Sequence, residues 1–370
     1  MQTNPGLEGI VVADTTLSLV DGAAGRLVVG GFDVETLASR HDVEAVAHLL
    51  LVGRLPDAAE HEAFRASLAR GRAEAFERLG GLGDALERRD AMDALRASVA
   101  HLEAVPGERS IDETLRIVAA VGVYAAAWAR KRSGRALVAP SLGARHAEDF
   151  LRMLHDRTPT PAEAAGLDAY LVTVADHGMN ASTFAARVVV STESDDVSAV
   201  VAGIAALKGR LHGGAPGPVL DMLDAVGTPE RAEAVLARAI ASGERIMGMG
   251  HRIYRVRDPR AAVLEAAIER LEAAGEGGDR LRLARSVERT AERLLAAKKP
   301  DRPLRANVEF YTAVLLEALG LPRELFTATF ATGRVVGWLS HCREQRRTGR
   351  LIRPASRYVG PMPDASRDCA

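Results

Sequence analysis

The amino-acid sequence predicts a mainly α-helical fold with a small β-hairpin at its N-terminus. Short apolar runs separated by turn residues occur only in the first thirty residues. From Asp42 onward, apolar residues recur instead at the spacing of a helix, nearly to the C-terminus. The 370 residues exceed the usual size of one compact domain, so the chain is long enough for two or three units with their own cores.

The β prediction rests on three short apolar runs, which are Ile10–Val12, Leu17–Val20 and Leu27–Val29. Asp21-Gly22 and Gly25 lie between the last two runs. Asp-Gly and Gly supply the turn conformations that join neighbouring antiparallel strands. The sequence therefore predicts a hairpin over residues 17–29.

Helix starts are marked by an N-cap residue with Glu three positions later, or by Pro in the first turn. These signals are Ser110 to Glu113, which open a helix predicted to reach Ala129, Thr160 to Glu163, Thr228-Pro229 and Asp258-Pro259. Residues 308–319 and 326–339 have the apolar spacing of buried or half-buried helices. Glycines at 80, 81 and 83 interrupt the helical pattern between Ala73 and Arg96.

Composition excludes several classes of protein. A hydrophobic content of 47% with a net charge of −1 argues against a disordered chain and against a nucleic-acid binder that relies on positive charge. Cys342 and Cys369 cannot form a disulfide framework. No apolar run is long enough for a membrane span, and the first twenty residues lack the pattern of a signal peptide. We therefore expect a cytoplasmic protein that binds neither nucleic acid nor membrane.

Common catalytic signatures are missing from the sequence. It contains no G-x-S-x-G, no H-E-x-x-H and no paired C-x-x-C. Gly248-Met249-Gly250 begins like a dinucleotide-binding fingerprint, but Ile253 occupies the position of the third glycine. These absences argue against a nucleophile-elbow hydrolase, the common zinc sites and a Rossmann dinucleotide site.

Three histidines and one carboxylate have unusual surroundings. His177, His212 and His251 each lie next to glycine, which lets a ligand approach the backbone closely. Any one of them alone is more often a structural residue at a helix end. Glu309 lies between Val308 and Phe310, and a carboxylate in an apolar segment is costly unless it is paired or functional.

In combination, these segments resemble the citrate synthase family. The segments that carry the resemblance are Leu207–Ala215, Met247–Tyr254, Asp258–Arg260 and Asn307–Tyr311. It extends over nearly the whole chain, from Gly6–Gly9 to Leu351–Pro354. The resemblance implies a two-domain helical homodimer, with residues 1–212 and 315–370 in a large domain, 213–314 in a small domain and the active site between them.

The resemblance also implies an acyltransferase that condenses acetyl-CoA with oxaloacetate and hydrolyses the thioester to citrate and CoA. Glu309 would remove the methyl proton, because a weak carbon acid needs a positioned base. His212 would hydrogen-bond the thioester oxygen as the enol forms, and His251 would polarise the ketone of oxaloacetate. No metal or redox cofactor is implied, since acetyl-CoA is a substrate.

Further residues are implied in substrate binding. Arg260 and Arg334 would bind the carboxylates of oxaloacetate, because guanidinium forms charge-assisted, bidentate hydrogen bonds with them. His177 would make a further contact with oxaloacetate, and Arg353 would reach in from the partner subunit. The residues implied in CoA binding are Met247, Gly248, Met249, Gly250, Arg255, Arg302 and Arg305.

Two positions depart from the family pattern. Glu309 replaces the usual Asp, and an extra methylene that moves the carboxylate by more than ~1 Å can cost on the order of 100-fold in rate. Gly178 replaces a usual acidic residue after His177. Two alternatives remain open on the sequence: a 2-methylcitrate synthase that uses propionyl-CoA, and a non-catalytic paralogue that binds CoA or a carboxylate.

Overall fold

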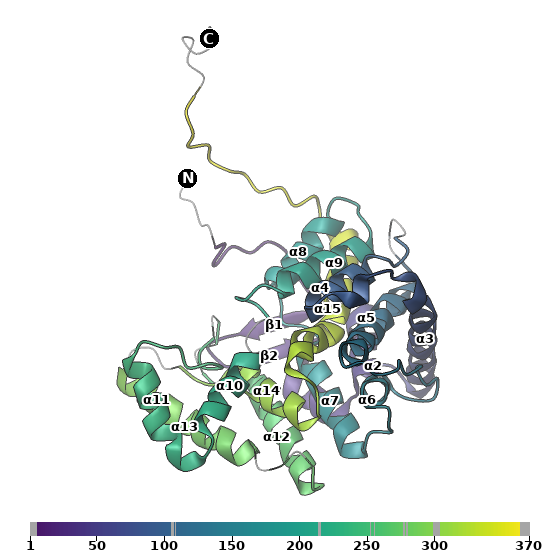
Figure 1. Cartoon of the computed structure of the whole chain (residues 1–370). Coiled ribbons are helices and arrows are strands. Elements are labelled where there is room, and N and C mark those ends of the chain that lie inside the picture. Colours follow the sequence, from purple (N-terminus) through teal and green to yellow (C-terminus); the bar gives the residue numbers. More distant parts are fainter. Residues whose placement is uncertain are drawn as a thin grey trace, which may run out of the picture.

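A computed structural model describes residues 6–104, 107, 109–213, 216–251, 253–254, 256–276, 278, 280–298 and 304–362. Helices make up most of this structure, and strands occur only near the N-terminus of the described residues, so the mainly α prediction is confirmed (Figure 1).

The N-terminal sheet has three short antiparallel strands in the order β1–β2–β3. They are β1 (Ser18–Asp21), β2 (Arg26–Val29) and β3 (Phe32–Asp33), and Val20 pairs with Leu27 in the predicted hairpin. The expectation of a strand at Ile10–Val12 is wrong: this segment is irregular, and Val11 is 83% exposed. An extended segment needs a neighbouring strand for its backbone hydrogen bonds, which the apolar run alone could not reveal.

Nine helices follow the sheet in the first part of the described chain. They are α1 (Val34–Arg40), α2 (Val43–Val52), α3 (Ala58–Glu77), α4 (Ala91–Val99), α5 (Ile111–Arg132), α6 (His146–His155), α7 (Pro161–Val174), α8 (Ala181–Val190) and α9 (Asp196–Leu207). The capping boxes at Ser110 and Thr160 are present and start α5 and α7. Helical structure begins at α1, before Asp42, because Val34 and Leu37 bury one face of a short helix.

Six further helices complete the described chain. They are α10 (Pro216–Val226), α11 (Ala232–Ala241), α12 (Pro259–Ala273), α13 (Arg280–Lys298), α14 (Val308–Ala318) and α15 (Phe326–Thr348). Asp258 caps α12 as predicted, but Thr228 makes no side-chain cap, and Pro229–Arg231 forms a 3₁₀ turn before α11. Helix α15 extends well past the predicted end at Leu339, because Cys342 and Gln345 continue its buried face.

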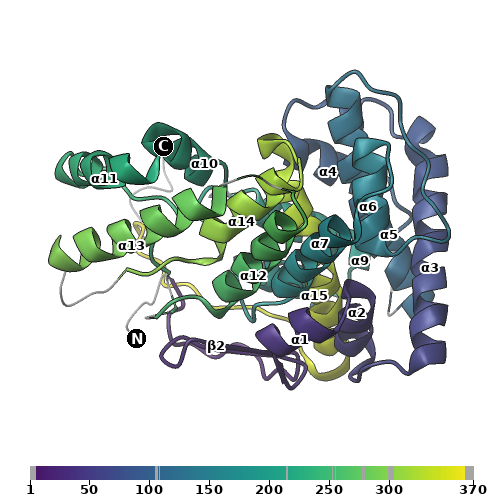
Figure 2. The same ribbon diagram turned by 90° about the horizontal axis from the view of Figure 1, so that it is seen from below.

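Helix α15 lies at the centre of the larger group of helices. It packs against α2, α4, α5, α7, α8 and α9. Helices α10, α11 and α13 lie to one side of this group in both views (Figures 1 and 2), and α12 and α14 pack on α7 between them. The domain boundaries at residues 212/213 and 314/315 stay predictions.

None of the helices in the described residues has the length and apolar character needed to cross a membrane. Within the same residues, no three His, Cys, Asp or Glu side chains are grouped so that they could hold a metal ion. That the reaction needs no metal or redox cofactor stays a prediction.

Candidate active site

The structure gathers six of the predicted site residues into one polar cluster. Five of them come from helix ends and loops, and Arg334 comes from the interior of α15: His177, His212, His251, Arg260, Glu309 and Arg334. Helix ends and loops leave side chains free of the regular packing that occupies the middle of a helix, so functional groups often lie there. The individual roles of these residues stay predictions.

His177 and His251 lie close together, with Tyr254 beside both. The ring centroids of the two histidines are 5.6 Å apart, and the Tyr254 ring lies 4.7 Å from that of His251. The Tyr254 hydroxyl is 3.2 Å from Nε2 of His177. Burial, and then the charges of Arg260 and Arg334, lower the pKa of His177 well below its usual value. His177 is therefore a neutral imidazole at physiological pH.

The loop that carries His251 fixes its tautomer. Nδ1 of His251 accepts the backbone N–H groups of Ile253 and Tyr254, each at 3.1 Å. Because this nitrogen accepts, the single proton of the neutral ring lies on Nε2. Burial, and then Arg260, lower the pKa of His251 to about 4. His251 therefore presents an Nε2–H donor.

His212 lies just beyond α9 and contacts the start of α8. Its Nε2 is 2.8 Å from the hydroxyl of Ser182, and the indole N–H of Trp338 donates to the same oxygen at 3.0 Å. Burial, and then Arg334, lower the pKa of His212 to about 4. This histidine is also neutral near pH 7, so one ring nitrogen donates and the other accepts.

Glu309 occupies the first turn of α14, where Asn307 caps the helix through the backbone N–H of Glu309 at 3.0 Å. The side chain is half-buried, but its Oε2 atom is inaccessible to solvent and has no hydrogen-bond partner in the described residues. Burial raises the pKa of Glu309 to about 7, although Arg260 opposes the shift. A carboxyl with a pKa near 7 can accept and release a proton at physiological pH.

The two arginines differ in their charge balance. Arg260 is held by Asp258 through two hydrogen bonds, of 3.0 Å from Nε and 2.8 Å from Nη2. Arg334 is 1% exposed, donates from Nε to the carbonyl of Val174 at 2.5 Å and lies over the Phe330 ring. Arg334 forms no ion pair with a carboxylate of the described chain. A buried cation without a direct counter-ion favours an anionic ligand.

The segment Met247–Gly250 forms a turn against the start of α14. The Gly250 N–H donates to the carbonyl of Arg305 at 2.7 Å, and the Asn307 N–H donates to that of Gly248 at 2.9 Å. Gly248 and Gly250 have φ of +72° and +87°, which side chains other than glycine rarely adopt. The backbone geometry therefore requires glycine at both positions.

A cavity of about 540 Å³ lies beside this turn and reaches His251. Its lining includes two of the residues implied in CoA binding, Met249 and Gly250, together with two cations that were not singled out from the sequence, Arg245 and Lys298. That any of these residues binds CoA stays a prediction. Apolar walls come from Ile240, Ile246, Leu295 and Leu304. Arg245 follows Glu244 closely and Lys298 ends a charged helix, so nothing in the sequence distinguished them from solvated surface residues.

The remaining predicted residues lie elsewhere. The guanidinium of Arg305 pairs with Glu292 on the surface, so in this structure it does not lie free to meet a phosphate. Arg353 is exposed and lines a separate cavity of about 950 Å³ between the N-terminal segment and the end of α15. Arg255 and Arg302 lie outside the described residues.

Comparisons with known proteins agree with the family resemblance seen in the sequence. The family model described as "Citrate synthase, C-terminal domain" matches residues 6–355. The chain is 35% identical to a citrate synthase of Acidithiobacillus ferridurans, covering 96% of this chain and 95% of that one. It is 39% identical to the citrate synthase of Haloferax volcanii, over 96% and 95% of the two chains.

A solved structure gives the same result. It is the ternary complex of citrate synthase from Thermoplasma acidophilum with carboxymethyl coenzyme A and oxaloacetate, which has 28% sequence identity and a TM-score of 0.87 over 98% of this chain and 97% of that one. The chain therefore belongs to the citrate synthase family and is an acyltransferase of the citrate synthase type.

Proposed function

We propose that the protein condenses acetyl-CoA with oxaloacetate and releases citrate and CoA. The observation that carries this proposal is a carboxyl with a pKa of about 7, Glu309, in a cluster with two neutral histidines, His212 and His251. Removal of a proton from the carbon next to a thioester requires a base and a hydrogen-bond donor that act together. The Thermoplasma relative binds oxaloacetate and a CoA analogue, which supports the same substrates here.

In the first step, Glu309 takes a proton from the methyl group of acetyl-CoA. His212 stabilises the resulting enol by donating from Nδ1 to the thioester oxygen. This requires Nε2 of His212 to accept the proton of the Ser182 hydroxyl, 2.8 Å away. The indole of Trp338 can only donate to Ser182, so the single proton of that hydroxyl has two possible acceptors at 2.8 Å, Nε2 of His212 and Oδ1 of Asn180. Oδ1 of Asn180 already accepts the backbone N–H groups of Ser182 and Thr183, each at 3.1 Å, which favours His212 as the acceptor of this proton.

In the second step, the enol carbon attacks the ketone carbon of oxaloacetate. The Nε2–H of His251 polarises the ketone and delivers its proton to the alkoxide that forms. The ring then regains a proton from solvent, while Glu309 releases the proton that it took from the methyl group, so that the protons balance over the cycle. Arg260 and Arg334 bind the two carboxylates, and His177 adds a hydrogen bond. The buried, unpaired guanidinium of Arg334 supports this part of the proposal most directly.

Hydrolysis completes the reaction. Water attacks the citryl thioester carbon, the C–S bond breaks, and CoA leaves as the protonated thiol. CoA lies along the 247–250 turn and in the neighbouring cavity, where the cations Arg245 and Lys298 face its phosphates. Residues 213–314 form the small domain of this arrangement and close on the large domain formed by 1–212 and 315–370, which excludes water until condensation is complete.

A second copy of the chain supplies Arg353. Residues after α15 leave the helices as an extended tail (Figure 1), which carries exposed apolar side chains at Tyr358, Val359 and Met362. Exposed apolar groups on such a segment favour docking against another surface. We therefore propose a homodimer in which each tail brings Arg353 to the other site, in the cytoplasm and without a metal or redox cofactor.

The test is CoA thiol release by the purified protein with oxaloacetate, using acetyl-CoA and propionyl-CoA in parallel. Higher kcat/KM with acetyl-CoA supports the proposal, whereas higher kcat/KM with propionyl-CoA assigns 2-methylcitrate formation to the same residues. The control is Glu309→Gln, which should abolish release with either thioester while oxaloacetate still binds. No release by a folded wild-type protein that binds oxaloacetate would contradict the proposal.

A further inference from the structure

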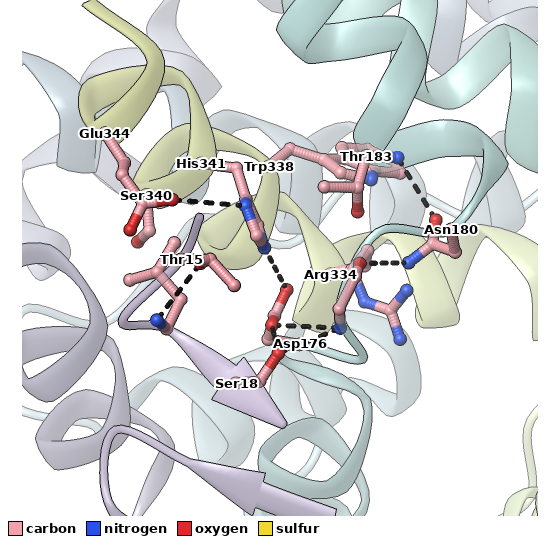
Figure 3. Close-up of polar contacts among 12 residues, drawn as sticks. Thr15, Ser18, Asp176, Asn180, Thr183, Arg334, Trp338, Ser340, His341 and Glu344 are labelled. Carbon is pink, nitrogen blue, oxygen red and sulfur yellow. Dashed lines mark hydrogen bonds and ion pairs between the residues drawn. The ribbon is translucent and has the colours of Figure 1, made fainter. Parts of the chain in front are cut away.

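Asp176 is a fully buried carboxylate immediately before His177. Figure 3 shows it between His341 of α15 and Ser18 of β1. Nε2 of His341 lies 3.2 Å from Oδ1, while Oδ2 accepts the Ser18 hydroxyl and, at 3.2 Å, the Gly178 N–H. Burial by itself would raise the pKa of Asp176, but the contacts with His341, Arg334 and Ser18 outweigh it and lower the pKa. Asp176 is therefore ionised.

The proton positions in this network follow from the donors. Nη1 of Arg187 lies 3.0 Å from Nδ1 of His341, and a guanidinium has hydrogen-bond donors only. Nδ1 of His341 must therefore accept, which leaves the ring proton on Nε2. His341 then donates that proton to Asp176. The result is a directed chain of hydrogen bonds from Arg187 through His341 to Asp176.

Glu344 balances the positive charge of Arg187 at the other end of this series of hydrogen bonds. Nη1 of Arg187 also donates to Oε2 of Glu344 at 2.8 Å, and Nε donates to Gln345 at 3.0 Å. Oε1 of Glu344 accepts the backbone N–H of Thr16 at 2.9 Å. A buried guanidinium costs free energy unless it is paired, and Glu344 supplies that pairing. The network thus leaves the Nε2–H of His341 directed at Asp176.

The backbone around His177 depends on this network. Gly178 has φ of +60°, and its N–H donates to Ser18 at 2.9 Å as well as to Asp176. On α15, one turn before His341, a Cβ at Gly337 would lie only 2.8 Å from Oδ1 of Asp176. The missing side chains at 178 and 337 let the turn approach both β1 and α15. Residues 176–178 are therefore held from two sides.

We propose that His341 is a positioning residue, which holds Asp176 and thereby sets the orientation of His177 toward oxaloacetate. The proposal rests on the proposed function. In the proposed arrangement, His341 does not contact the substrate. Its ring acts only through the turn at residues 176–178. Ser18 supports the same carboxylate from the opposite side. Residue 178 is a glycine, so Asp176 is the one carboxylate next to His177 in the sequence.

The orientation of His177 matters because its Nε2 is aimed into the cluster, 3.2 Å from the Tyr254 hydroxyl. A misplacement of about 1 Å at a reacting centre can cost on the order of 100-fold in rate. Loss of the His341 donor should therefore weaken oxaloacetate binding selectively. A purely structural role would lower the melting temperature without favouring one substrate.

The experiment compares His341→Leu with His341→Gln, whose side-chain amide keeps an N–H donor at a similar reach. KM for oxaloacetate, KM for acetyl-CoA and the melting temperature are measured for both. We expect His341→Leu to raise KM for oxaloacetate roughly tenfold, the effect of one hydrogen bond, with little change in KM for acetyl-CoA. His341→Gln should restore most of the loss.

The matched control is Ser340→Ala, which removes a buried hydrogen bond to Val336 one residue away without touching Asp176. It should lower stability but change neither KM. Ser18→Ala tests the same carboxylate from β1 and should raise KM for oxaloacetate in the same direction, even if His341→Leu fails to fold. Equal changes in both KM values, or none in any variant, overturn the proposal. Inactive wild-type protein would instead contradict the proposed function.

Discussion

Asp258 connects the arginine of α12 to the first turn of α14. Its Oδ1 accepts Nε of Arg260 at 3.0 Å, and its Oδ2 accepts both Nη2 of Arg260 and, at 3.2 Å, the backbone N–H of Val308. Val308 directly precedes Glu309. The carboxylate of Asp258 therefore fixes the separation between a proposed substrate-binding arginine and the proposed base.

The Asp258→Ala substitution should both destabilise the protein and impair catalysis. The pair with Arg260 is almost fully buried, and removal of one partner of a buried ion pair typically costs about 3–5 kcal/mol. Arg260 would also lose its orientation. We expect a clear drop in the melting temperature by calorimetry and a higher KM for oxaloacetate.

The control for this substitution is Asp84→Ala, which removes an ion pair with Arg88 that is exposed to solvent. Exposed pairs contribute about 0–1 kcal/mol, so this variant should resemble the wild type. Equal losses in the two variants would show that burial of the Asp258–Arg260 pair has no special importance.

The pH dependence of the reaction should report Glu309. A base acts in its ionised form, and the pKa of this carboxyl is raised to about 7. Above that pH the carboxyl of Glu309 is mostly ionised and can act as a base, so activity should fall as the pH decreases through about 7. The measurement is kcat/KM for acetyl-CoA across pH 5.5–8.5, a range of roughly 1.5 units on each side of that pKa. Glu309→Asp should shift this limb, since the shorter side chain places the carboxylate at a different distance from Arg260 and Asp258, which act on its pKa. An activity well above the wild type would contradict a site adapted to Glu.

The free energy of unfolding should depend on pH through Glu309 in the opposite direction to the activity. Because the folded pKa of Glu309 is raised above its value in the unfolded chain, the folded protein binds this proton more tightly. The contribution to stability is present at low pH and is lost as the pH rises toward 7. Glu309→Gln should therefore stabilise the protein at pH 8, by a few kcal/mol at most and on the order of 1.4 kcal/mol per pKa unit. Urea denaturation at pH 5 and pH 8 measures this difference.

The Ser182→Ala substitution tests the orientation of His212. Without the hydroxyl at 2.8 Å, Nε2 of His212 no longer has a donor that selects the Nδ1–H tautomer. We expect kcat to fall roughly tenfold, equivalent to about 1.4 kcal/mol, while KM for oxaloacetate changes little. The control is Ser198→Ala, which removes a hydrogen bond to Asp195 at the start of α9. A normal kcat in the first variant would argue against this tautomer.

Gly337→Ala tests the close approach of α15 to the turn before His177. The added Cβ would meet the carbonyl of Ala175 and Oδ1 of Asp176, and a backbone atom cannot move away cheaply. Overpacking of this kind typically costs about 1–3 kcal/mol, which thermal denaturation should detect. Gly80→Ala is the control, since a Cβ at that position has nothing within 4 Å. A wild-type melting temperature for Gly337→Ala would show that the helix shifts freely.

Local signals in the sequence predicted the hairpin and the starts of α5, α7 and α12. The capping residues Ser110, Thr160 and Asp258 act within three residues of their own position, so the sequence states them directly. Six of the proposed site residues also lie together as expected, because the resemblance covers ordered motifs along the whole chain. The end of α15 was missed, since Cys342 and Gln345 look unremarkable until their packing partners are known.

The supporting residues could not be predicted for a related reason. Ser182, Asp176 and His341 have hydrogen-bond partners 30 to 165 positions away, and their proposed roles depend on those contacts. Such pairs have no spacing rule in the sequence, and each residue taken alone is an ordinary buried polar group. Arg353 is the opposite case, because its implied role requires a second chain that a single sequence does not describe.

The contact between Thr16 and Glu344 joins positions that are 328 residues apart. During synthesis, Thr16 therefore leaves the ribosome 328 residues before its partner on α15 does. Six helices also pack against α15, so part of their apolar surface stays exposed until α15 has formed. The larger group of helices therefore cannot finish packing until α15 has been translated. A chain that ends before residue 326 would have these faces exposed and would depend on chaperones to avoid aggregation.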